Sequence, residues 1–350
     1  MLMQGGSTSY HTGERKGLGQ LLRKALSQPA KIPLAVRTEL FTLKVLAEEG
    51  MPDYLLQFLG GIGDELLLTA VAREIKRRNP KAKIWQVSHS PGVLENNPDY
   101  ARVFSWDYLP LRFSNLLNGR RVRLRYTEFQ VPSEVETPPQ RHIIAELCYR
   151  AGIRGEVAIR PYLFLTADEE ARGRLAPRQI VVHCVGERAH ETYMANKVWP
   201  KPYYDEMLSL LRNRKGFTRE YQIIQVGTQR DPPLPGVLDL RGRTTLRETA
   251  AILRNADAFI GGSGLLSHMA RAVDCRAVVI YGGREHSYQS GYTCNENLNS
   301  LVDCAPCWRW NTCEWDRKCL TRISPQMVVE ALDRVLARRN EPLMVDSVTL

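Results

Sequence analysis

The sequence predicts an α/β fold made of two facing doubly wound, Rossmann-like domains, with a short cysteine-rich finger towards the carboxyl end. The chain has 350 residues, which is more than one hydrophobic core usually contains, so two domains are expected. Strand-like and helix-like segments alternate in both halves, which is typical of doubly wound parallel sheets. Four of the eight cysteines lie between Cys304 and Cys319, and this crowding predicts the finger.

The composition is that of an ordinary globular protein and excludes disordered and fibrous classes. Hydrophobic residues make up 43% and charged residues 25%, and no apolar run is long enough to cross a bilayer. Residues 1–13 are polar and lack a signal-peptide pattern, so we expect a cytoplasmic location. The formal net charge of +10 favours anionic partners, which could be nucleotide phosphates, acidic lipid headgroups or nucleic acid.

The pattern divides the chain into four parts. Residues 1–50 form a basic extension, for which a solvated, partly helical segment is favoured over a helix lying on a membrane surface. An α/β domain is expected over 51–165 and a second over 179–340, joined by a charged and polar linker at 166–178. Because ligands of doubly wound sheets bind beyond the carboxyl ends of the strands, we expect the site in the cleft between the two domains.

Apolar periodicity places the individual elements. In the first half, a strand over 54–59, a glycine turn, a helix over 64–78 and a strand over 82–87 form one β-α-β unit. In the second half, strands are expected over 179–184, 222–226, 258–260 and 277–281, and helices over 201–214, 246–255 and 267–273.

The first candidate site is the turn Gly60-Gly61-Ile62-Gly63-Asp64. Its glycines allow close backbone approach, and the following helix presents free N–H groups to an anion. A dinucleotide fingerprint would need Gly or Ala where Leu66 stands, and Asp64 would repel a pyrophosphate, so a dehydrogenase is disfavoured. Asp64 is interpreted either as a helix cap or as a carboxylate that accepts a proton in the cleft.

The second candidate site is the glycine turn at 261–264 and the helix start that follows it. The N–H groups of Ser263 and Gly264, the Ser263 hydroxyl and His268 are placed to hold a diphosphate. A serine-hydrolase elbow would require glycine where Leu265 stands, so that class is excluded. The alternative is that His268 is a packed or capping histidine and Ser267 an ordinary helix residue.

The cysteine cluster has the spacing Cys304-x2-Cys307-x5-Cys313-x5-Cys319, with tryptophans between the cysteines. Four thiolates in so short a segment suit a closed tetrahedral site for zinc or iron. Such a site would stabilise the fold and do no chemistry, so no redox cofactor is expected. Buried free cysteines or a labile disulfide are the alternative.

Several short sequences occur in a fixed order along residues 54–338. They are Gly63-Asp64, Lys76-Arg77-Arg78-Asn79-Pro80, Glu95-Asn96-Asn97-Pro98, Asn196-Lys197-Val198-Trp199-Pro200, Gln225-Val226-Gly227-Thr228, the 261–268 turn, Gly282-Gly283 and Ile323-Ser324-Pro325. In this order they resemble glycosyltransferase family 9, which includes the ADP-heptose-dependent heptosyltransferases. The tryptophan-rich cysteine cluster is similar to the iron-binding finger of the heptosyltransferases that modify autotransporter proteins. Many family members carry Asp-Ser-Gly or Asp-Thr-Gly before the histidine, whereas this chain has Ser263 in a Gly-Ser-Gly sequence.

The resemblance implies a GT-B architecture and an inverting transfer of a heptose-like sugar from a nucleotide diphosphate, ADP-heptose above all, to an acceptor hydroxyl. It implies that Asp64 is the base, that Gly61 and Gly63 shape the acceptor-side turn, and that the donor contacts Lys197, Gly227, Thr228, Leu246, Gly262, Ser263, Gly264 and His268. It also implies a lipid-linked, saccharide or protein acceptor, as in lipopolysaccharide biosynthesis, and allows peripheral membrane contact and oligomer formation.

Three other classes of protein stay open at this stage. One is another enzyme of the same architecture, such as a hexose transferase or a nucleotide-sugar epimerase. A second is a nucleic-acid-binding module, which is disfavoured because the basic residues are spread along the chain. The third is a catalytically idle scaffold, against which Asp64 and Lys197 argue.

Overall fold

The structure, a computed structural model, describes residues 33–58, 60–107, 113–129, 135–186 and 194–350. It divides into two compact units, residues 1–50 with 108–118 and residues 51–107 with 119–350. In the smaller unit, helix α2 (Leu34–Glu49) ends at Gly50, whose N–H caps the Leu46 carbonyl. The basic residues expected before position 33 and the strand end expected at Leu59 lie outside the described residues.

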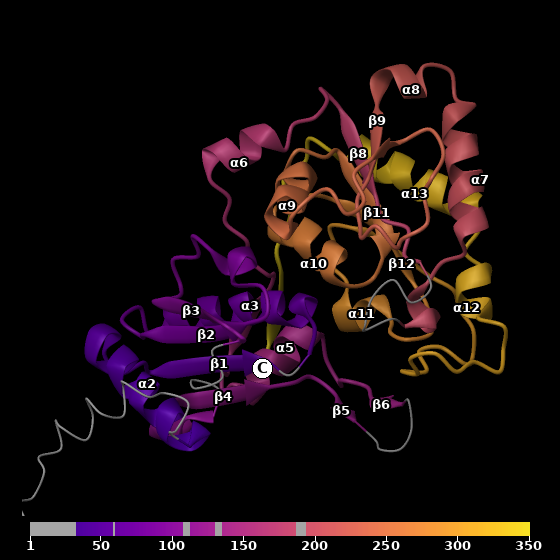
Figure 1. Ribbon diagram of the computed structural model, residues 1–350. Helices are drawn as coiled ribbons and strands as arrows, with labels where there is room; N and C mark the ends of the chain where they lie inside the picture. The colour runs from indigo at the N-terminus through magenta and orange to yellow at the C-terminus, as the bar shows by residue number, and fades with distance from the viewer. Residues whose placement is uncertain (1–32, 59, 108–112, 130–134, 187–193) are drawn as a thin grey trace, which may run out of the picture. The chain divides into compact units, whose positions relative to one another are not determined.

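The larger unit contains a four-stranded parallel sheet in the order β3-β2-β1-β4 (Figure 1). Its strands are β1 (Tyr54–Phe58), β2 (Ile84–Ser88), β3 (Arg102–Ser105) and β4 (Arg121–Leu124). Helix α3 (Ile62–Arg78) is the crossover from β1 to β2 and packs with α5 (Ile143–Arg150). One core cluster joins Leu56 and Phe58 of β1 to the buried faces of these two helices.

The same unit contains a six-stranded parallel sheet in the order β10-β9-β8-β11-β12-β13. In chain order this is the 3-2-1-4-5-6 arrangement of a dinucleotide-binding fold. Its strands are β8 (Gln179–Val182), β9 (Gln222–Gln225), β10 (Leu238–Asp239), β11 (Ala258–Gly262), β12 (Ala277–Tyr281) and β13 (Glu296–Asn299).

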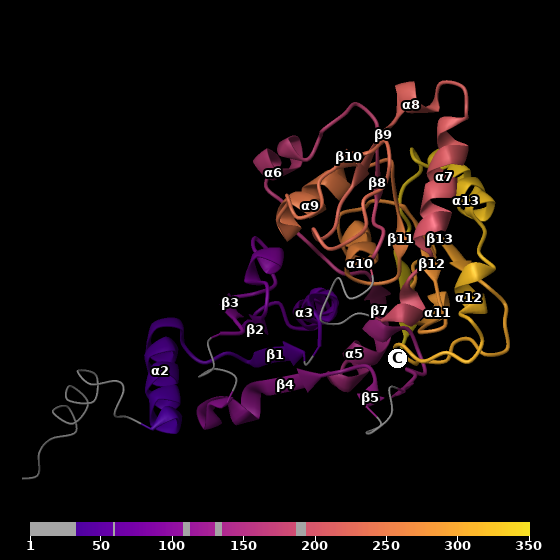
Figure 2. The ribbon, with the colours of Figure 1, turned by 45° about the vertical axis from the view of Figure 1, so that its right-hand side comes forward.

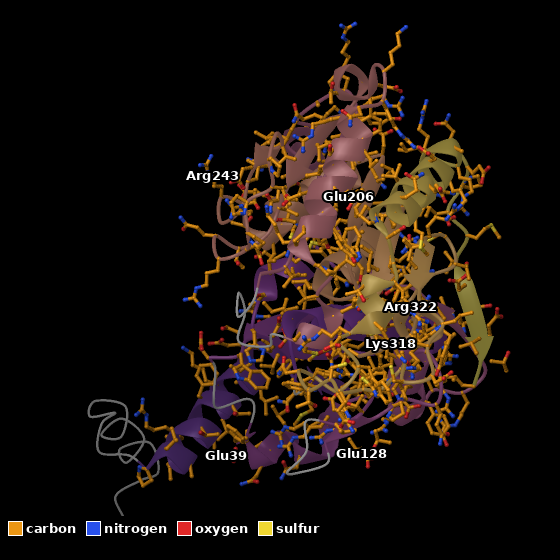
Figure 3. The ribbon with its side chains drawn as sticks, turned by 90° about the vertical axis from the view of Figure 1, so that its right-hand side faces the viewer. Glu39, Glu128, Glu206, Arg243, Lys318 and Arg322 are labelled. Carbon is orange, nitrogen blue, oxygen red and sulfur yellow. The ribbon has the colours of Figure 1, made fainter. Side chains whose placement is uncertain are left out.

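Helices cover both faces of the six-stranded sheet, because alternate strand residues point to opposite sides. Ile180 and Val182 of β8 pack in one cluster with α7 (Lys201–Arg212) and α13 (Pro325–Ala337). Val181 packs in another cluster with α9 (Leu246–Arg254) and α10 (Leu265–Ala272). Figures 1 and 2 show the two helix pairs on opposite faces. On α7 the apolar face is buried, and exposed Glu206 points outwards (Figure 3).

Shorter elements complete the described chain. They are β5 (Glu128–Phe129), β6 (Glu136–Thr137), β7 (Glu156–Ile159), β14 (Asp346–Thr349), α6 (Ala167–Arg172), α8 (Phe217–Glu220), α11 (Ser287–Ser290), α12 (Lys318–Thr321), η2 (Pro91–Leu94), η3 (Asn115–Arg120) and η4 (Ala195–Lys197). In the described part of the chain, no helix has the length and apolarity needed to cross a membrane. The predicted α/β class with doubly wound parallel sheets is confirmed.

Candidate active site

The two glycine turns singled out in the sequence lie at the switch points of the two sheets. In the four-stranded sheet, β1 and β4 are neighbours whose crossovers run in opposite directions, and the turn at 60–64 follows β1. In the six-stranded sheet the corresponding neighbours are β8 and β11, and Ser263 follows β11. Switch points are where doubly wound sheets bind ligands, so the fold itself directs attention to these two turns.

Asp64 is held by two hydrogen bonds at the first switch point. Its Oδ2 accepts from the N–H of Gly61 at 3.0 Å, which caps that N–H at the start of α3. Its Oδ1 accepts from the Tyr126 hydroxyl at 2.8 Å, and Tyr126 lies just beyond the end of β4. Asp64 therefore caps its helix and is also fixed in orientation, so the two sequence interpretations do not exclude each other.

The groups around Asp64 have opposite effects on the pKa of its carboxyl. Burial raises the pKa of the Asp64 carboxyl above its ordinary value, and the negative charge of Glu285 acts in the same direction. The hydrogen bonds from Tyr126 and Gly61 and the positive charge of Lys197 act against this rise. A carboxylate with a raised pKa that is still hydrogen-bonded in its ionised form is suited to accept a proton.

Gly63 allows the starts of two helices to approach closely. A Cβ atom at Gly63 would lie 3.2 Å from the Cα of Leu265, the first residue of α10. The absence of a side chain at Gly63 thus brings the beginning of α3 next to the beginning of α10. Asp64 and the second glycine turn come together for this reason.

The second turn packs directly against the segment that carries Lys197. A Cβ atom at Gly262 would lie 3.2 Å from the Lys197 carbonyl oxygen. Gly264 has φ +149°, a backbone conformation that residues with side chains rarely adopt. This turn places Ser263 beside Lys197, as the prediction of a shared diphosphate site requires.

The backbone N–H groups of the second turn are used inside the protein. The N–H of Ser263 donates to the Ile280 carbonyl at 3.3 Å, and the N–H of Gly264 donates to Ser267 Oγ at 3.0 Å. Among the described residues, the buried Ser263 hydroxyl makes no hydrogen bond of good geometry, but it lies close enough to Glu285 to help lower the pKa of that carboxyl. Of the polar groups predicted for this turn, the Ser263 hydroxyl is the one that faces a neighbouring side chain and not the backbone.

His268 is buried one turn into α10. Its Nδ1 lies 2.8 Å from the Tyr292 hydroxyl, and burial lowers its pKa to about 3. The imidazole is therefore neutral at physiological pH and supplies no positive charge to a phosphate. Its observed contact is that of a packed histidine, the alternative that the sequence left open.

Lys197 forms an ion pair with a residue that the sequence did not single out. Its Nζ lies 2.6 Å from Oε1 of Glu285, which follows the end of β12. Lys197 retains 23% side-chain exposure, whereas Glu285 retains 6%. The preceding residue, Arg284, donates to Glu136 and lies 4.0 Å from the centroid of the Trp308 ring. The positive charge of Lys197 is therefore paired with Glu285 in the protein without a ligand.

Gly227 and Thr228 form a turn organised by Asp231. The N–H of Thr228 donates to Asp231 Oδ2 at 2.7 Å, and the N–H of Gly186 donates to Asp231 Oδ1 at 2.9 Å. Gly227 has φ +139°, and a Cβ there would crowd both Asp231 and His183. Asp231 thereby ties the loop after β9 to the loop after β8.

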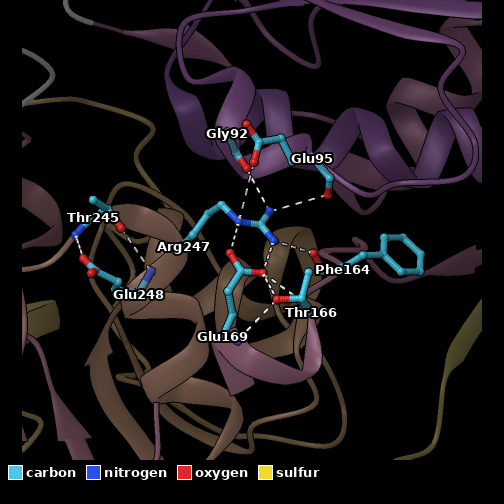
Figure 4. Close-up of polar contacts among 8 residues, drawn as sticks. All are labelled: Gly92, Glu95, Phe164, Thr166, Glu169, Thr245, Arg247 and Glu248. Atoms are coloured by element: carbon cyan, nitrogen blue, oxygen red, sulfur yellow. Dashed lines mark hydrogen bonds and ion pairs between the residues drawn. The ribbon is translucent and has the colours of Figure 1, made fainter. Parts of the chain in front are cut away.

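Leu246 is the half-buried first residue of α9, and its neighbour Arg247 joins three segments (Figure 4). The Arg247 guanidinium binds both carboxylate oxygens of Glu169 at 2.5 and 2.6 Å. It also donates to the carbonyls of Gly92 and Phe164, each at 2.9 Å. These bonds connect the second sheet's helix layer to the segment after β2 and to the predicted linker.

The four predicted metal-ligand cysteines line one cavity of about 140 Å³, together with Asn196 and Gly283. Backbone N–H groups of Trp315 and Arg317 each donate to Cys313 Sγ at 3.4 Å. In the part of the chain that the structure describes, no three His, Cys, Asp or Glu side chains are gathered closely enough to bind a metal ion. The donor set therefore fits zinc or iron in kind and location, although the thiols do not converge on one point.

Known proteins are similar to this chain over parts of its length. Residues 165–314 match the family model of glycosyltransferase family 9 (heptosyltransferase). Lipopolysaccharide heptosyltransferase 1 of Pseudomonas aeruginosa is 27% identical over 166 residues, covering 42% of this chain and 46% of that protein. Lipooligosaccharide heptosyltransferase 2 of Haemophilus influenzae is 22% identical over 204 residues, covering 51% and 56%. The chain spans about half the length of the curated relatives it matches.

Solved structures share the fold. Escherichia coli ADP-heptose lipopolysaccharide heptosyltransferase II superimposes with a TM-score of 0.58 at 15% identity, covering 81% of this chain and 99% of that one. The dodecameric iron-containing heptosyltransferase TibC of E. coli, in complex with ADP-D-β-D-heptose, gives 0.60 at 14% identity, covering 83% and 77%.

The two doubly wound sheets and the paired switch-point turns define the GT-B class of α/β proteins. Within that class, the resemblance to glycosyltransferase family 9 is confirmed, and the chain is heptosyltransferase-like.

Sequence reasoning missed Tyr126, Glu285, Asp231 and Arg247. Tyr126, Glu285 and Arg247 reach partners that are distant in the sequence. Asp231 binds Thr228, three residues before it, and also the distant Gly186. Tyr126 and Glu285 follow the carboxyl ends of β4 and β12, so the rule that ligands bind at strand ends could have signalled both.

Proposed function

We propose that this chain is an inverting glycosyltransferase that moves a heptose from ADP-heptose to an acceptor hydroxyl. The observation that carries the proposal is the closeness of Asp64 and Lys197: the positive charge of Lys197 acts on the Asp64 carboxyl, and Gly63 and Gly262 bring their two turns together. One turn carries a proton acceptor and the other carries a cation, which are the two groups that a single displacement from a nucleotide diphosphate needs.

Asp64 acts as the general base. The acceptor hydroxyl gives its proton to the Asp64 carboxylate while its oxygen attacks the anomeric carbon of the donor. The bond from that carbon to the diphosphate breaks in the same step, with an oxocarbenium-like transition state and inversion of configuration. The bonds from Tyr126 and Gly61 keep the carboxylate oriented.

Lys197 and the Ser263 hydroxyl stabilise the departing nucleotide. Negative charge grows on the diphosphate as the sugar leaves, and a fixed ammonium and a hydroxyl donor stabilise it most in a partly buried site. In this proposal Gly262 and Gly264 shape the turn, and His268 packs behind it as a neutral residue.

The nucleoside is assigned to the neighbouring loops of the second sheet. Leu246 supplies an apolar surface for the base at the start of α9. Gly227 and Thr228 lie in the loop after β9, at the same carboxyl edge of the sheet. Gly61 belongs to the opposite turn, on the side of the acceptor.

The cysteine-rich segment is assigned a structural metal, zinc or iron, held by Cys304, Cys307, Cys313 and Cys319. When bound, such a metal would cross-link the segment and do no chemistry. Iron is favoured by analogy because TibC contains iron. The segment also supports the site, since Asn196, next to Lys197, donates through Nδ2 to the carbonyls of Arg309 and Thr312 at 3.1 and 3.0 Å.

Partners and location follow from the same proposal. The acceptor is a saccharide, lipid-linked or protein hydroxyl, with lipopolysaccharide favoured by the names of the curated relatives. TibC is dodecameric, so an oligomer is expected here too. All eight cysteines are unpaired, which fits the reducing cytoplasm, and the net charge of +10 suits work at an anionic membrane surface.

The test uses ADP-heptose and heptose-deficient lipopolysaccharide, with release of ADP as the signal. The wild-type chain is expected to release ADP in an acceptor-dependent manner. Lys197→Ala is expected to weaken ADP binding measured by calorimetry. ADP-heptose altered in the absence of acceptor would instead indicate an epimerase, and turnover only with a hexose nucleotide would assign another donor.

A further inference from the structure

Glu285 is an acidic residue beside Lys197 to which the proposed function gives no role. It is buried, with 5% of its surface exposed, and follows β12 by a few residues. Its Oε1 is 2.6 Å from Lys197 Nζ, and the Ser263 hydroxyl also favours its ionised form. A carboxylate in this position contacts both groups that are assigned to the diphosphate.

The negative charge of Glu285 is stable despite burial. Burial alone would raise its pKa, yet the charges of Lys197 and Arg284 hold the pKa at about 2. Glu285 is therefore ionised over the whole physiological range and pairs with the Lys197 ammonium in the free protein. A long, flexible lysine side chain is thereby confined to one geometry before any ligand arrives.

Glu285 also acts on the residue across the site. Four charged or titratable groups influence Asp64: Tyr126 and Lys197 favour its ionised form, Glu285 opposes it, and Arg284 attracts it. Without Glu285, the Asp64 carboxylate would face a lysine whose charge is no longer balanced. Glu285 thus sets the balance of charge between the two sides of the reaction.

We propose that Glu285 is a positioning residue for the transfer reaction: it fixes the Lys197 ammonium beside Ser263 and balances its charge, so that Asp64 keeps a strong affinity for the acceptor's proton. This inference rests on the proposed function. In addition, Lys197 stays paired with Glu285 when the donor binds. The diphosphate of the donor then contacts the Lys197 ammonium without displacing Glu285.

The test compares Glu285→Gln with Glu285→Asp and with the control Asp205→Asn. Asp205 pairs with Lys201 at the same 2.6 Å on α7, in a partly exposed ion pair within that helix. Three quantities are measured: kcat for ADP release, the pH dependence of kcat/KM, and the rate at which an acylating reagent modifies Lys197, followed by mass spectrometry.

Glu285→Gln is expected to lower kcat about ten- to a hundred-fold, the range found when a residue that orients a metal ligand is removed. The acid limb of its kcat/KM profile is expected to move to lower pH, because the loss of a neighbouring negative charge lowers the pKa of Asp64. Lys197 should be acylated faster than in the wild type. Glu285→Asp should keep the wild-type acid limb with a partial loss of kcat, and Asp205→Asn should match the wild type.

An unchanged acid limb and unchanged Lys197 reactivity in Glu285→Gln would overturn the inference, whatever its kcat. If Glu285→Gln does not fold, Glu285→Asp decides: a reduced kcat supports the inference and a wild-type kcat overturns it. The acylation rates need no turnover, so they test the ion pair even if ADP-heptose is not the donor. Wild-type protein that releases no ADP would defeat the proposed function and leave this measurement intact.

Discussion

Removal of one hydroxyl group, in Tyr126→Phe, tests how the fold tunes the proposed base. The Tyr126 hydroxyl donates to Asp64 Oδ1 at 2.8 Å and favours the ionised carboxylate. A hydrogen bond to a charged group contributes about 1.5–3 kcal/mol. Its loss therefore strengthens proton binding by Asp64 by about ten- to a hundred-fold, since 1.36 kcal/mol corresponds to a factor of ten.

The sign of the effect follows from which form of Asp64 is active. The base must be ionised, so the rate falls as pH decreases through the pKa of Asp64. Burial already raises that pKa, and removal of the Tyr126 hydroxyl raises it further. The acid limb of kcat/KM should consequently move to higher pH, opposite to the direction expected for Glu285→Gln.

The assay is ADP release at a series of pH values, with the rate at the alkaline plateau as the internal reference. Tyr149→Phe is the control, because Tyr149 is 41% exposed on α5 and its ring packs against Arg141 and Arg154. Tyr126→Phe should recover much of the wild-type rate at the plateau. An acid limb that stays in place, or moves to lower pH, would refute the assignment of Asp64 as the base.

Three further changes probe the surroundings of the site. Gly282→Ala would place a Cβ against the Asn196 carbonyl, so we expect about 1–3 kcal/mol less stability in denaturant unfolding and weaker ADP binding in calorimetry. Burial lowers the pKa of His142 to about 4 from 6.5. The free energy of unfolding should therefore fall by up to about 3 kcal/mol as the pH decreases from 6.5 towards 4. A free energy of unfolding that does not change over this pH range would refute this. His142→Asn should reduce the slope. Elemental analysis should find about one zinc or iron per chain in the wild type. The metal should be lost in Cys304→Ser and kept in the control Cys148→Ser. A wild-type protein without metal would exclude the site.

The secondary structure was largely predictable because its signals are local. Strand β12 (Ala277–Tyr281) has the predicted bounds, since five consecutive apolar residues form a strand buried on both faces. Helix α9 begins at Leu246 as predicted, where Thr245 and Glu248 form a capping box. Helix α10 begins at Leu265, two residues earlier than predicted, because Gly264 turns the chain and Ser267 closes the first turn through its hydroxyl.

Only the site residues that lie in a glycine turn after a strand could be predicted from the sequence. Asp64 and Ser263 stand in glycine turns after strands, a pattern visible in one stretch of sequence. Tyr126 lies 62 residues from Asp64, and no local pattern relates the two. The same holds for Glu285, whose pairing with Lys197 depends on β8 and β12 flanking β11 in one sheet. The sequence predicts that the N–H groups of Ser263 and Gly264 bind a ligand, and this is wrong because both donate inside the protein, to the Ile280 carbonyl and to Ser267 Oγ. The first of these acceptors is distant in the sequence, so no local pattern reveals it.

The central claim is that Asp64 accepts the acceptor's proton during sugar transfer. The most direct measurement compares Asp64→Asn with the wild type in two quantities, kcat for ADP release and the Kd for ADP-heptose from calorimetry. We expect kcat to fall by at least about a hundredfold while the Kd stays close to the wild-type value, because asparagine preserves the shape of the turn but cannot take up the proton. Near-normal turnover in Asp64→Asn would contradict it.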